Sequence, residues 1–165
     1  AAAAPGYRPR NLTDTMTGEA RVRARELGEE ATRAAEGLSH PEGPFCLLAG
    51  GETTVTITGG GLGGRNQEMA LAAAIHMDEL ADCQHIAMLC AGTDGTDGPT
   101  DAAGGYASGS TLCVARDCGV DAHGHLADND AYHFLDRTGH LLRTGPTLTN
   151  VMDLAVLLVD TPQKA

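Results

Sequence analysis

Three short stretches of the sequence combine residue types that could bind an anion, and the richest is GGGLGGRNQE at residues 59–68. Glycine lets a backbone bend freely or approach a ligand closely, and a helix that starts after such a loop offers free N–H groups and a positive dipole end. The arginine after the glycines can grip a phosphate or a carboxylate in a bidentate fork. We therefore expect one of these two anions to bind here. The candidate residues are Gly59, Gly61, Gly63, Gly64, Arg65 and Asn66.

The same glycines fit a dinucleotide-binding loop only in part. Gly59, Gly61 and Gly64 satisfy G-x-G-x-x-G between a strand-like and a helix-like segment. That fold also needs an acidic residue at the end of the next strand, about 20 residues on, to hold the ribose. Asp82 precedes the next predicted strand, and Asp94 follows it but lies 30 positions beyond Gly64. The fingerprint is incomplete, and a glycine turn that only lets strand and helix pack closely is an open alternative.

The second stretch is TDGTDGPTD at residues 93–101, directly after an apolar run. Ligands of α/β sheets collect outside the carboxyl ends of strands, so Asp94, Asp97 and Asp101 are candidate binding residues. Carboxylates there could hold Mg²⁺, with Asp94 and Asp97 as the tentative ligands, or accept a proton from a substrate hydroxyl. Asp and Gly are also ordinary residues of tight turns, so a purely structural loop is the alternative.

The third stretch has two parts, ADND at 127–130 and TGPTLTN at 144–150. Asn129 could cap a helix or join the site, and Thr144 and Asn150 could line the same face. The seven histidines are scattered, and the H-x-H of His123 and His125 has no third ligand at a usual spacing. No metal site is therefore expected among them.

Apolar periodicity predicts the elements that position these loops. A stripe stepping by three and four residues from Ala20 to Leu38 predicts a helix from Thr17, ended by SHPEGP. Residues 1–16 carry prolines and no periodicity, so a tail or linker is expected. The other predicted elements are strands at 45–49, 53–58, 85–90 and 153–159 and helices at 65–77, 110–118 and 130–138. Their order predicts an α/β fold, a layered single domain with a mixed, largely buried sheet flanked by helices.

Composition narrows the functional classes. A length of 165 residues suits one domain, and 42% hydrophobic residues can form a core. The net charge of −11 argues against a nucleic-acid partner, which needs basic patches. No stretch is long and apolar enough to suggest a membrane span. The five cysteines include no Cys-x-x-Cys pair, which indicates a reduced, intracellular protein.

Taken together, the motif stretches resemble a known family. AGGETTVTITGGGLGGRNQE, AGTDGTDGPTDAAG and LADNDAYHFLDRTGHLLRTGPTLTNVMDL are similar to three signature blocks of the MOFRL domain, in the family's order. That domain is the C-terminal part of the glycerate 2-kinase family, whose older label is hydroxypyruvate reductase. The resemblance assigns residues 45–160 to a MOFRL-like domain, 17–44 to a helix leading into it and 161–165 to a C-terminal tail.

The resemblance implies transfer of the γ-phosphoryl group of ATP to the 2-hydroxyl of D-glycerate, with Mg²⁺ as cofactor. The family's site lies between this domain and a larger N-terminal domain that supplies an essential lysine. Arg65 would neutralise the carboxylate of glycerate or the transferring phosphate, and Asp94 would orient Mg²⁺ or the attacking hydroxyl. Because the sequence begins AAAA rather than Met and the blocks begin near residue 45, we expect a fragment without that N-terminal domain, inactive alone. A cytoplasmic location is expected, and a homo-oligomer is an open alternative.

Three positions depart from the family pattern. Leu62 stands where a basic residue is common, Ser108 near a common acidic position, and Leu148 where the family usually has glycine. Two other functional classes also stay open. One is an NAD(P)H-dependent hydroxypyruvate reductase, and the other is a non-catalytic binding or regulatory module.

Overall fold

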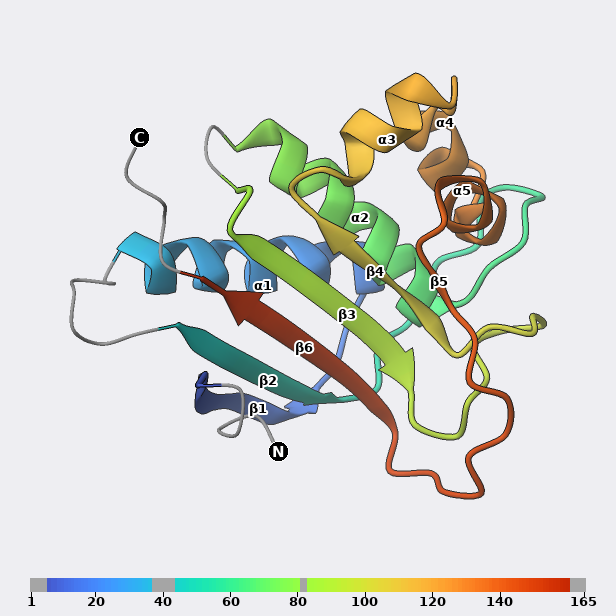
Figure 1. Ribbon diagram of the computed structural model, residues 1–165. Helices are drawn as coiled ribbons and strands as arrows, with labels where there is room; N and C mark the ends of the chain where they lie inside the picture. The colour runs from blue at the N-terminus through green and yellow to red at the C-terminus, as the bar shows by residue number, and fades with distance from the viewer. Residues whose placement is uncertain (1–5, 37–43, 81–82, 161–165) are drawn as a thin grey trace.

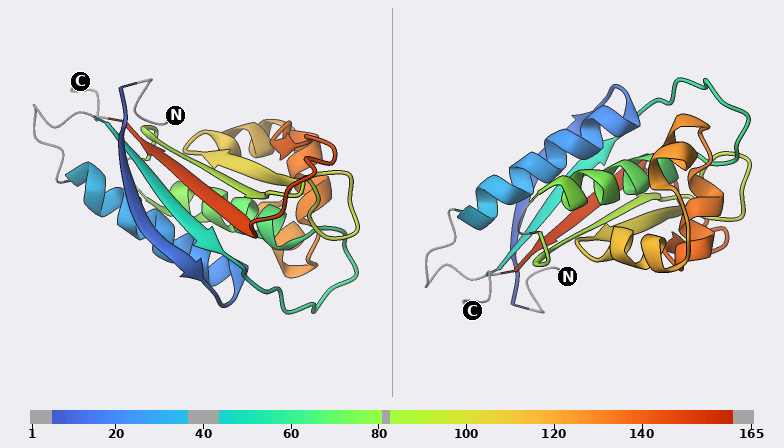
Figure 2. Two further views of the ribbon diagram at one scale, coloured as in Figure 1. Left: turned by 90° about the horizontal axis from the view of Figure 1, so that it is seen from below. Right: turned by 90° about the horizontal axis from the view of Figure 1, so that it is seen from above.

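The computed structural model describes residues 6–36, 44–80 and 83–160. Its centre is a six-stranded mixed sheet in the order β1-β2-β6-β3-β4-β5, with the helices on one side (Figures 1 and 2). This architecture confirms the predicted mixed α/β domain. The strands are β1 (Arg8–Met16), β2 (Phe45–Gly51), β3 (Ile86–Gly92), β4 (Gly104–Ser108), β5 (Leu141–Leu142) and β6 (Asp153–Val159). The helices are α1 (Ala20–Glu36), α2 (Arg65–Glu79), α3 (Thr111–Asp117), α4 (Ala122–Ala127) and α5 (Ala131–Thr138).

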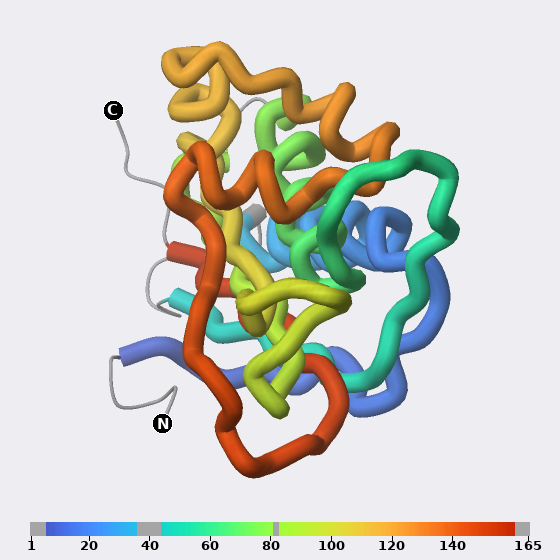
Figure 3. The backbone as a smooth tube through the Cα atoms, turned by 90° about the vertical axis from the view of Figure 1, so that its right-hand side faces the viewer, coloured from blue at the N-terminus to red at the C-terminus, as the bar shows by residue number. Residues whose placement is uncertain are grey.

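The register of the central strands brings three loops to one end of the sheet. β6 runs antiparallel to both of its neighbours, β2 and β3. Its first residue, Asp153, therefore lies beside Gly51 at the end of β2 and Gly92 at the end of β3. The segments that leave β2 and β3 and the loop that enters β6 consequently meet there. Figure 3 shows these loops together on one side of the molecule.

Helix α2 is the centre of the core. Its residues 66–77 are all buried, as the apolar sequence of this helix predicts. α1 packs beside it through a stripe of small and apolar residues. The stripe consists of Ala20, Ala24, Leu27, Ala31 and Ala34. The predicted long amphipathic helix is therefore confirmed, although it begins at Ala20 rather than at Thr17. Its predicted end at residues 38–44 falls largely outside the described ranges.

The expected tail at residues 1–16 is wrong for its second half. Residues 8–16 form the edge strand β1, which pairs in parallel with β2, whereas residues 1–5 lie outside the described ranges. Most of β1 is exposed, so no apolar alternation marks it as a strand. Pro9 is tolerated because an edge strand needs no donor on its outer side.

The expected strand at 53–58 is also wrong. The alternation of TTVTIT is real, but the segment leaves the sheet after Gly51 and passes the start of α1. Thr54 exchanges backbone hydrogen bonds with Gly18 and Ala20, both at 2.8 Å, in an isolated bridge. Strand-like conformation thus occurs here without a place in the sheet.

Three short elements were not predicted. β4 begins with two glycines, α4 spans six residues and β5 spans two, so none of them has room for a periodic signal. α4 begins at an N-cap, where the Asp121 side chain accepts a hydrogen bond from the His123 amide. None of the helices in the described ranges is long and apolar enough to cross a membrane.

Buried His76 makes the packing of α1 against α2 sensitive to pH. The residue is 5% exposed, and its ring touches Gly28 so closely that a side chain at Gly28 would overlap it. Neither ring nitrogen has a hydrogen-bond partner among the described residues. Burial lowers the pKa of His76, the charge of Arg25 lowers it further, and Glu79 opposes both.

We therefore expect stability to fall in acid. Between the lowered pKa and the usual value of about 6.5, the unfolded chain binds a proton that folded His76 does not, so the free energy of unfolding falls as the pH falls. His76→Leu should make this dependence shallower, and His123→Leu, at an exposed position, is the control. Urea unfolding at several pH values measures the slope. Equal slopes for His76→Leu and the parent chain would contradict the assignment.

Candidate functional site

The glycine-rich loop is held by the segment at residues 128–130, just before α5. Five consecutive amides donate to that segment. Those of Thr58 and Gly59 reach Asn129 Oδ1 at 2.7 and 2.9 Å, and those of Gly60, Gly61 and Leu62 reach Asp128 Oδ1, Asp128 O and Asp130 Oδ1, each at 2.9 Å. The loop is thus fixed along its first half by the chain's own oxygens.

Close packing explains three of the glycines. A side chain at Gly59 would overlap the backbone of Asp128, one at Gly61 would overlap Asp130, and one at Gly64 would overlap the carboxyl group of Asp97. Gly63 meets only ordinary contacts. The alternative of close backbone packing therefore accounts for Gly59, Gly61 and Gly64.

Asp97 occupies the start of α2. Its Oδ1 accepts from the Asn66 amide and Asn66 Nδ2, both at 3.1 Å, and its Oδ2 accepts from the Gln67 amide at 2.8 Å. The residue is 4% exposed, and burial raises the pKa of Asp97 while these hydrogen bonds oppose that rise. The positive end of the helix dipole therefore already faces one anion, the side chain of Asp97.

Hydrogen bonds already engage both members of the predicted magnesium pair. Asp97 Oδ1 accepts two hydrogen bonds and its Oδ2 accepts one. Asp94 Oδ1 accepts from the amide and the hydroxyl of Thr96 at 3.0 and 3.1 Å. The described ranges contain no group of three His, Cys, Asp or Glu side chains arranged to hold a metal ion. The binding of Mg²⁺ by Asp94 and Asp97 stays a prediction.

Arg65 is the first residue of α2 and is bound on one side by carboxylates. Its Nε and NH2 donate to Asp153 Oδ2 and Oδ1 at 2.6 and 3.0 Å, and its NH1 lies 3.0 Å from Glu52 Oε1. The hydrogen bonds that Arg65 donates to Asp153 raise the pKa of Arg65, against the effect of burial. An arginine has five N–H groups, so two are left for a ligand. The guanidinium of Arg65 is therefore only partly available to bind an anionic ligand.

A cavity of about 540 Å³ opens beside the start of α2, a size typical of small-molecule sites. Its lining includes Gly63, Gly64, Arg65 and the buried side chain of Thr53, which is 2% exposed. The amides of residues 63–65 have no acceptor among the described residues, and Thr53 Oγ1 has no partner there either. Three adjacent amides and part of a guanidinium in the cavity lining are thus left without a partner from the described residues, while the Thr53 hydroxyl is buried.

The loop at 92–104 lies at the same end of the sheet, as predicted. Gly98 packs directly on Gly63. Hydrogen bonds from Thr96 are the main cause of the lowered pKa of Asp94, and the charge of Arg65 also lowers this pKa. The loop that enters β6 joins them, because the Thr147 amide donates to Asp94 O at 3.1 Å. One site built from these loops is therefore geometrically sound.

Other predicted residues lie outside the cavity, and Asp94 and Asn66 are not among its lining residues either. Asp101 accepts from Tyr132 OH at 2.8 Å and from Arg143 Nε at 2.9 Å in an exposed cluster. Thr144 donates to the adjacent Gly145 O, and Asn150 Oδ1 accepts from the Met152 amide. All three lie at the loop end of the sheet, and none lines the cavity.

Asn129 does line the cavity, and it organises the site rather than capping a helix. It is buried in a left-handed conformation, with φ at 54°. Its Nδ2 donates to Thr56 O at 3.2 Å and to Glu68 Oε2 at 3.0 Å. Glu68 Oε1 accepts from Arg21 Nε at 2.9 Å, which ties α1 to the loop. Glu68 and Asp153 were not among the predicted site residues, although each is a charged residue directly before an apolar run.

Comparison with known proteins identifies the family of this chain. The model of the MOFRL family matches residues 45–153. The chain belongs to the MOFRL family. A D-glycerate 2-kinase of Thermotoga maritima is 50% identical over 116 residues, 70% of this chain and 27% of that protein. A glycerate 2-kinase of Pyrococcus horikoshii is 41% identical over 155 residues, 93% of this chain and 34% of that protein. The chain thus spans about a third of the length of these relatives.

A solved structure shares the fold. The crystal structure of glycerate kinase from Thermotoga maritima aligns with a TM-score of 0.87 at 41% identity, over 96% of this chain and 37% of that one. The MOFRL domain described above is therefore one part of a larger known architecture.

All three departures from the MOFRL pattern can be placed. Leu62 uses its backbone to bond Asp130 and Tyr132, which needs no particular side chain. Leu148 is 99% exposed and keeps the left-handed conformation that favours glycine, with φ at 60°. Ser108 ends β4, at the end of that strand away from the loop at 93–103.

Asp97→Asn should destabilise the domain by about 1–3 kcal/mol. The side-chain NH2 of the new asparagine would face the backbone N–H of Asn66 or Gln67, so two donors would meet without an acceptor. Asp94→Asn makes the same chemical change at an exposed turn and should cost less than about 0.5 kcal/mol. Urea unfolding compares the two. A smaller loss for Asp97→Asn than for Asp94→Asn would show that Asp97 does not stabilise the start of α2.

Leu148→Gly should stabilise the domain by about 0.5–1 kcal/mol, because the exposed side chain contributes no packing while its Cβ strains the left-handed backbone. Leu148→Ala keeps the Cβ and should leave stability unchanged. Equilibrium unfolding of both variants gives the comparison. A gain for alanine equal to that for glycine would exclude backbone strain as the cause.

Proposed function

We propose that this MOFRL domain is part of a glycerate 2-kinase, which transfers the γ-phosphoryl group of ATP to the 2-hydroxyl of D-glycerate. The names of the relatives support this proposal. The observation that carries it is the run of amides from Thr58 to Gln67. The first five bond to residues 128–130 and the last two to Asp97, while those of residues 63–65, which line the cavity, have no acceptor in the described part of the chain. An anionic oxygen of either substrate fits there.

Arg65 contributes charge that is already oriented. Asp153 is 2% exposed and holds the guanidinium edge formed by Nε and NH2, Glu52 lies against NH1, and Asn66 Nδ2 donates to the carboxylate of Asp153 at 3.1 Å. The two remaining N–H groups therefore have a fixed direction before a ligand arrives. Such preorganised donors stabilise the charge of a phosphoryl-transfer transition state without reorganisation at the moment of reaction.

The same ion pairs leave the site short of positive charge. Asp153 and Glu52 together outweigh the single charge of Arg65. Arg143, the other arginine of the motif stretches, pairs with Asp101 and Asp136. Phosphoryl transfer requires cations around the γ-phosphate. We therefore propose that the rest of the polypeptide, the N-terminal domain, supplies the missing cation and that this chain alone has no enzyme-like activity.

Asp94 is the candidate that orients the attacking hydroxyl. Hydrogen bonds from Thr96 lower the pKa of Asp94, so it is a carboxylate at neutral pH and can accept the hydroxyl proton as a hydrogen bond. In the transfer, the oxygen of the 2-hydroxyl bonds to the γ-phosphorus, the bond from that phosphorus to the β–γ bridging oxygen breaks, and the hydroxyl proton is released. Magnesium is part of the family's chemistry, but no step here depends on it.

The alternatives have less support. A reductase would place the pyrophosphate of its cofactor at the start of α2, where Asp97 already accepts the amides of Asn66 and Gln67. A non-catalytic module is favoured only by the shortage of cations, which the missing polypeptide would remedy. We also propose a cytoplasmic location, which fits five free cysteines.

In the complete enzyme, Arg65→Ala should lower kcat/KM by at least about a hundredfold, because one oriented charge is lost from the transition state. Arg65→Lys should recover only part of this, since an ammonium cannot replace the fork. Arg143→Ala removes an arginine outside the cavity and serves as the matched control. Steady-state kinetics with ATP and D-glycerate are the measurement. Near-parental activity of Arg65→Ala, or full activity of this chain alone, would refute the proposal.

A further inference from the structure

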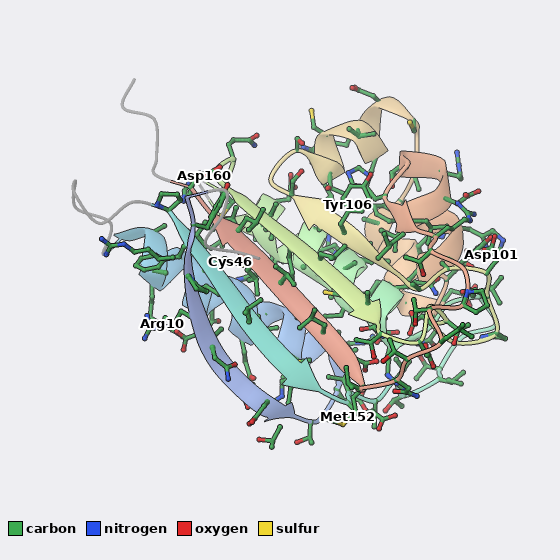
Figure 4. All side chains as sticks on the ribbon, turned by 60° about the horizontal axis from the view of Figure 1, so that its bottom comes forward. Arg10, Cys46, Asp101, Tyr106, Met152 and Asp160 are labelled. Atoms are coloured by element: carbon green, nitrogen blue, oxygen red, sulfur yellow. The ribbon has the colours of Figure 1, made fainter. Side chains whose placement is uncertain are left out.

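Glu68 is a buried carboxylate beside a cavity that we expect to bind an anion. It lies in the first turn of α2, is 2% exposed and lines the cavity. Figure 4 shows that side chains with oxygen atoms gather at this end of the sheet, around Asp101 and Met152. A further negative charge opposes the binding of an anion, and a buried carboxylate is costly unless it is paired and hydrogen-bonded. The partners of Glu68 show what offsets this cost.

Both side-chain oxygens of Glu68 accept hydrogen bonds from other parts of the chain. Oε1 accepts from Arg21 Nε of α1 at 2.9 Å, and Oε2 accepts from Asn129 Nδ2 at 3.0 Å. Arg21 is not among the residues that line the cavity, so its charge compensates that of Glu68 without occupying space for a ligand. The carboxylate of Glu68 is thus directed at the protein itself.

Glu68 also determines which way the side-chain amide of Asn129 faces. A carboxylate only accepts hydrogen bonds, so Nδ2 of Asn129 has to face it, and Thr56 O accepts from the same Nδ2 at 3.2 Å. Oδ1 of Asn129 is thereby directed at the amides of Thr58 and Gly59, which donate to it at 2.7 and 2.9 Å. A flipped Asn129 would place its NH2 group against these two N–H groups. Glu68 therefore selects the orientation in which Asn129 holds the glycine-rich loop.

The same residue is bonded to both ends of that loop. Through Asn129 its side chain holds the start, and its own amide donates to Gly64 O at 2.9 Å, in the first turn of α2. The amides of residues 63–65, which have no acceptor in the described part of the chain, lie next to this second attachment. A change at Glu68 therefore acts on the loop from both sides of the cavity-lining glycines.

We propose that Glu68 is a positioning residue of the anion site. Held by Arg21, it fixes Asn129 and, through Asn129, the loop that carries the amides of residues 63–65. Glu68 does not touch the ligand in this role; it keeps in place the donors that an anion meets, and small displacements of such donors are costly for the rate. Its effect on catalysis rests on the proposed function, whereas its effect on the loop is measured without a substrate.

A reciprocal exchange of two side chains tests the proposal. Glu68→Gln keeps the shape, but its NH2 group meets either Asn129 Nδ2 or Arg21 Nε, so one hydrogen bond is lost. Asn129→Asp keeps the acceptor for the two loop amides and places a second carboxylate against Glu68. The double variant Glu68→Gln/Asn129→Asp restores a donor and an acceptor between the two positions, with their direction reversed. It lacks the bond to Thr56 O, so we expect partial recovery.

Hydrogen exchange of the ¹⁵N-labelled chain is the first measurement. The amides of Thr58 and Gly59 should exchange at least about tenfold faster in each single variant, as for the loss of one hydrogen bond, and more slowly again in the double variant. Leu71, buried in the middle of α2, reports global stability. Equal acceleration of Leu71 and the loop amides, unchanged loop amides, or no recovery in the double variant would overturn the proposal.

Glu79→Gln is the matched control, because it makes the same chemical change at the last residue of α2. It should leave the exchange of the loop amides unchanged. Where a variant at a buried position unfolds the chain, Arg21→Met gives the comparison. It releases Oε1 of Glu68 from a side chain that is 34% exposed and should also accelerate the loop amides more than the core.

Kinetics of the complete enzyme are the second measurement. Partial unfolding lowers kcat by reducing the amount of active enzyme and leaves KM unchanged, whereas misplaced donors weaken the contact with a substrate. We expect Glu68→Gln to raise the KM for ATP or for D-glycerate at least about fivefold, and the double variant to reverse part of this rise. An unchanged KM for both substrates would contradict the positioning role. If the parental enzyme does not phosphorylate D-glycerate, the proposed function fails, while the exchange rates still decide whether Glu68 holds the loop.

Discussion

The hydrogen bonds between the carboxylate of Asp97 and the first amides of α2 are the interaction on which the rest of the site depends. They place an anion of the protein itself at the positive end of its most buried helix, at distances of 2.8 and 3.1 Å. Because Asp97 belongs to the loop after β3, these bonds also join that loop to the glycine-rich loop. Gly64 has to be a glycine because the carboxyl group of Asp97 lies against it.

Because of this constraint, the site consists of the hydrogen-bond donors that are left over from these internal contacts. Asp97 and residues 128–130 accept the amides on either side, so the amides of residues 63–65 are held in place yet have no acceptor among the residues that the structure describes. Asp153 and Glu52 fix Arg65 in the same way, with two of its five N–H groups left over. Preorganisation of this kind requires carboxylates close to the site, and those carboxylates create the shortage of positive charge that another part of the polypeptide would relieve.

The sequence was sufficient to predict elements whose burial pattern is strong. β6, α2 and α5 agree with their predicted positions because each carries a clear apolar period or run. β1 escaped prediction because an exposed edge strand has no such pattern, and 53–58 misled because its alternation comes from contacts with α1 and Asn129 rather than from a sheet. For the site, the motif spacing identified Arg65, Asn66 and Asp97, but not that Asn66 bonds Asp97 or that Arg65 and Asn66 share the carboxylate of Asp153. The shared carboxylate depends on the antiparallel register of β6, which brings Asp153 beside Gly92.

The central claim is that the free amides of residues 63–65 bind an anion of the substrates. Titration of the ¹⁵N-labelled chain with D-glycerate and, separately, with a non-hydrolysable ATP analogue tests it directly by chemical-shift changes of individual amides. The account predicts saturable shifts centred on Gly63, Gly64 and Arg65, with little change at Gly60, whose amide is already bonded to Asp128. Shifts confined to another surface, or none with either compound, would contradict it.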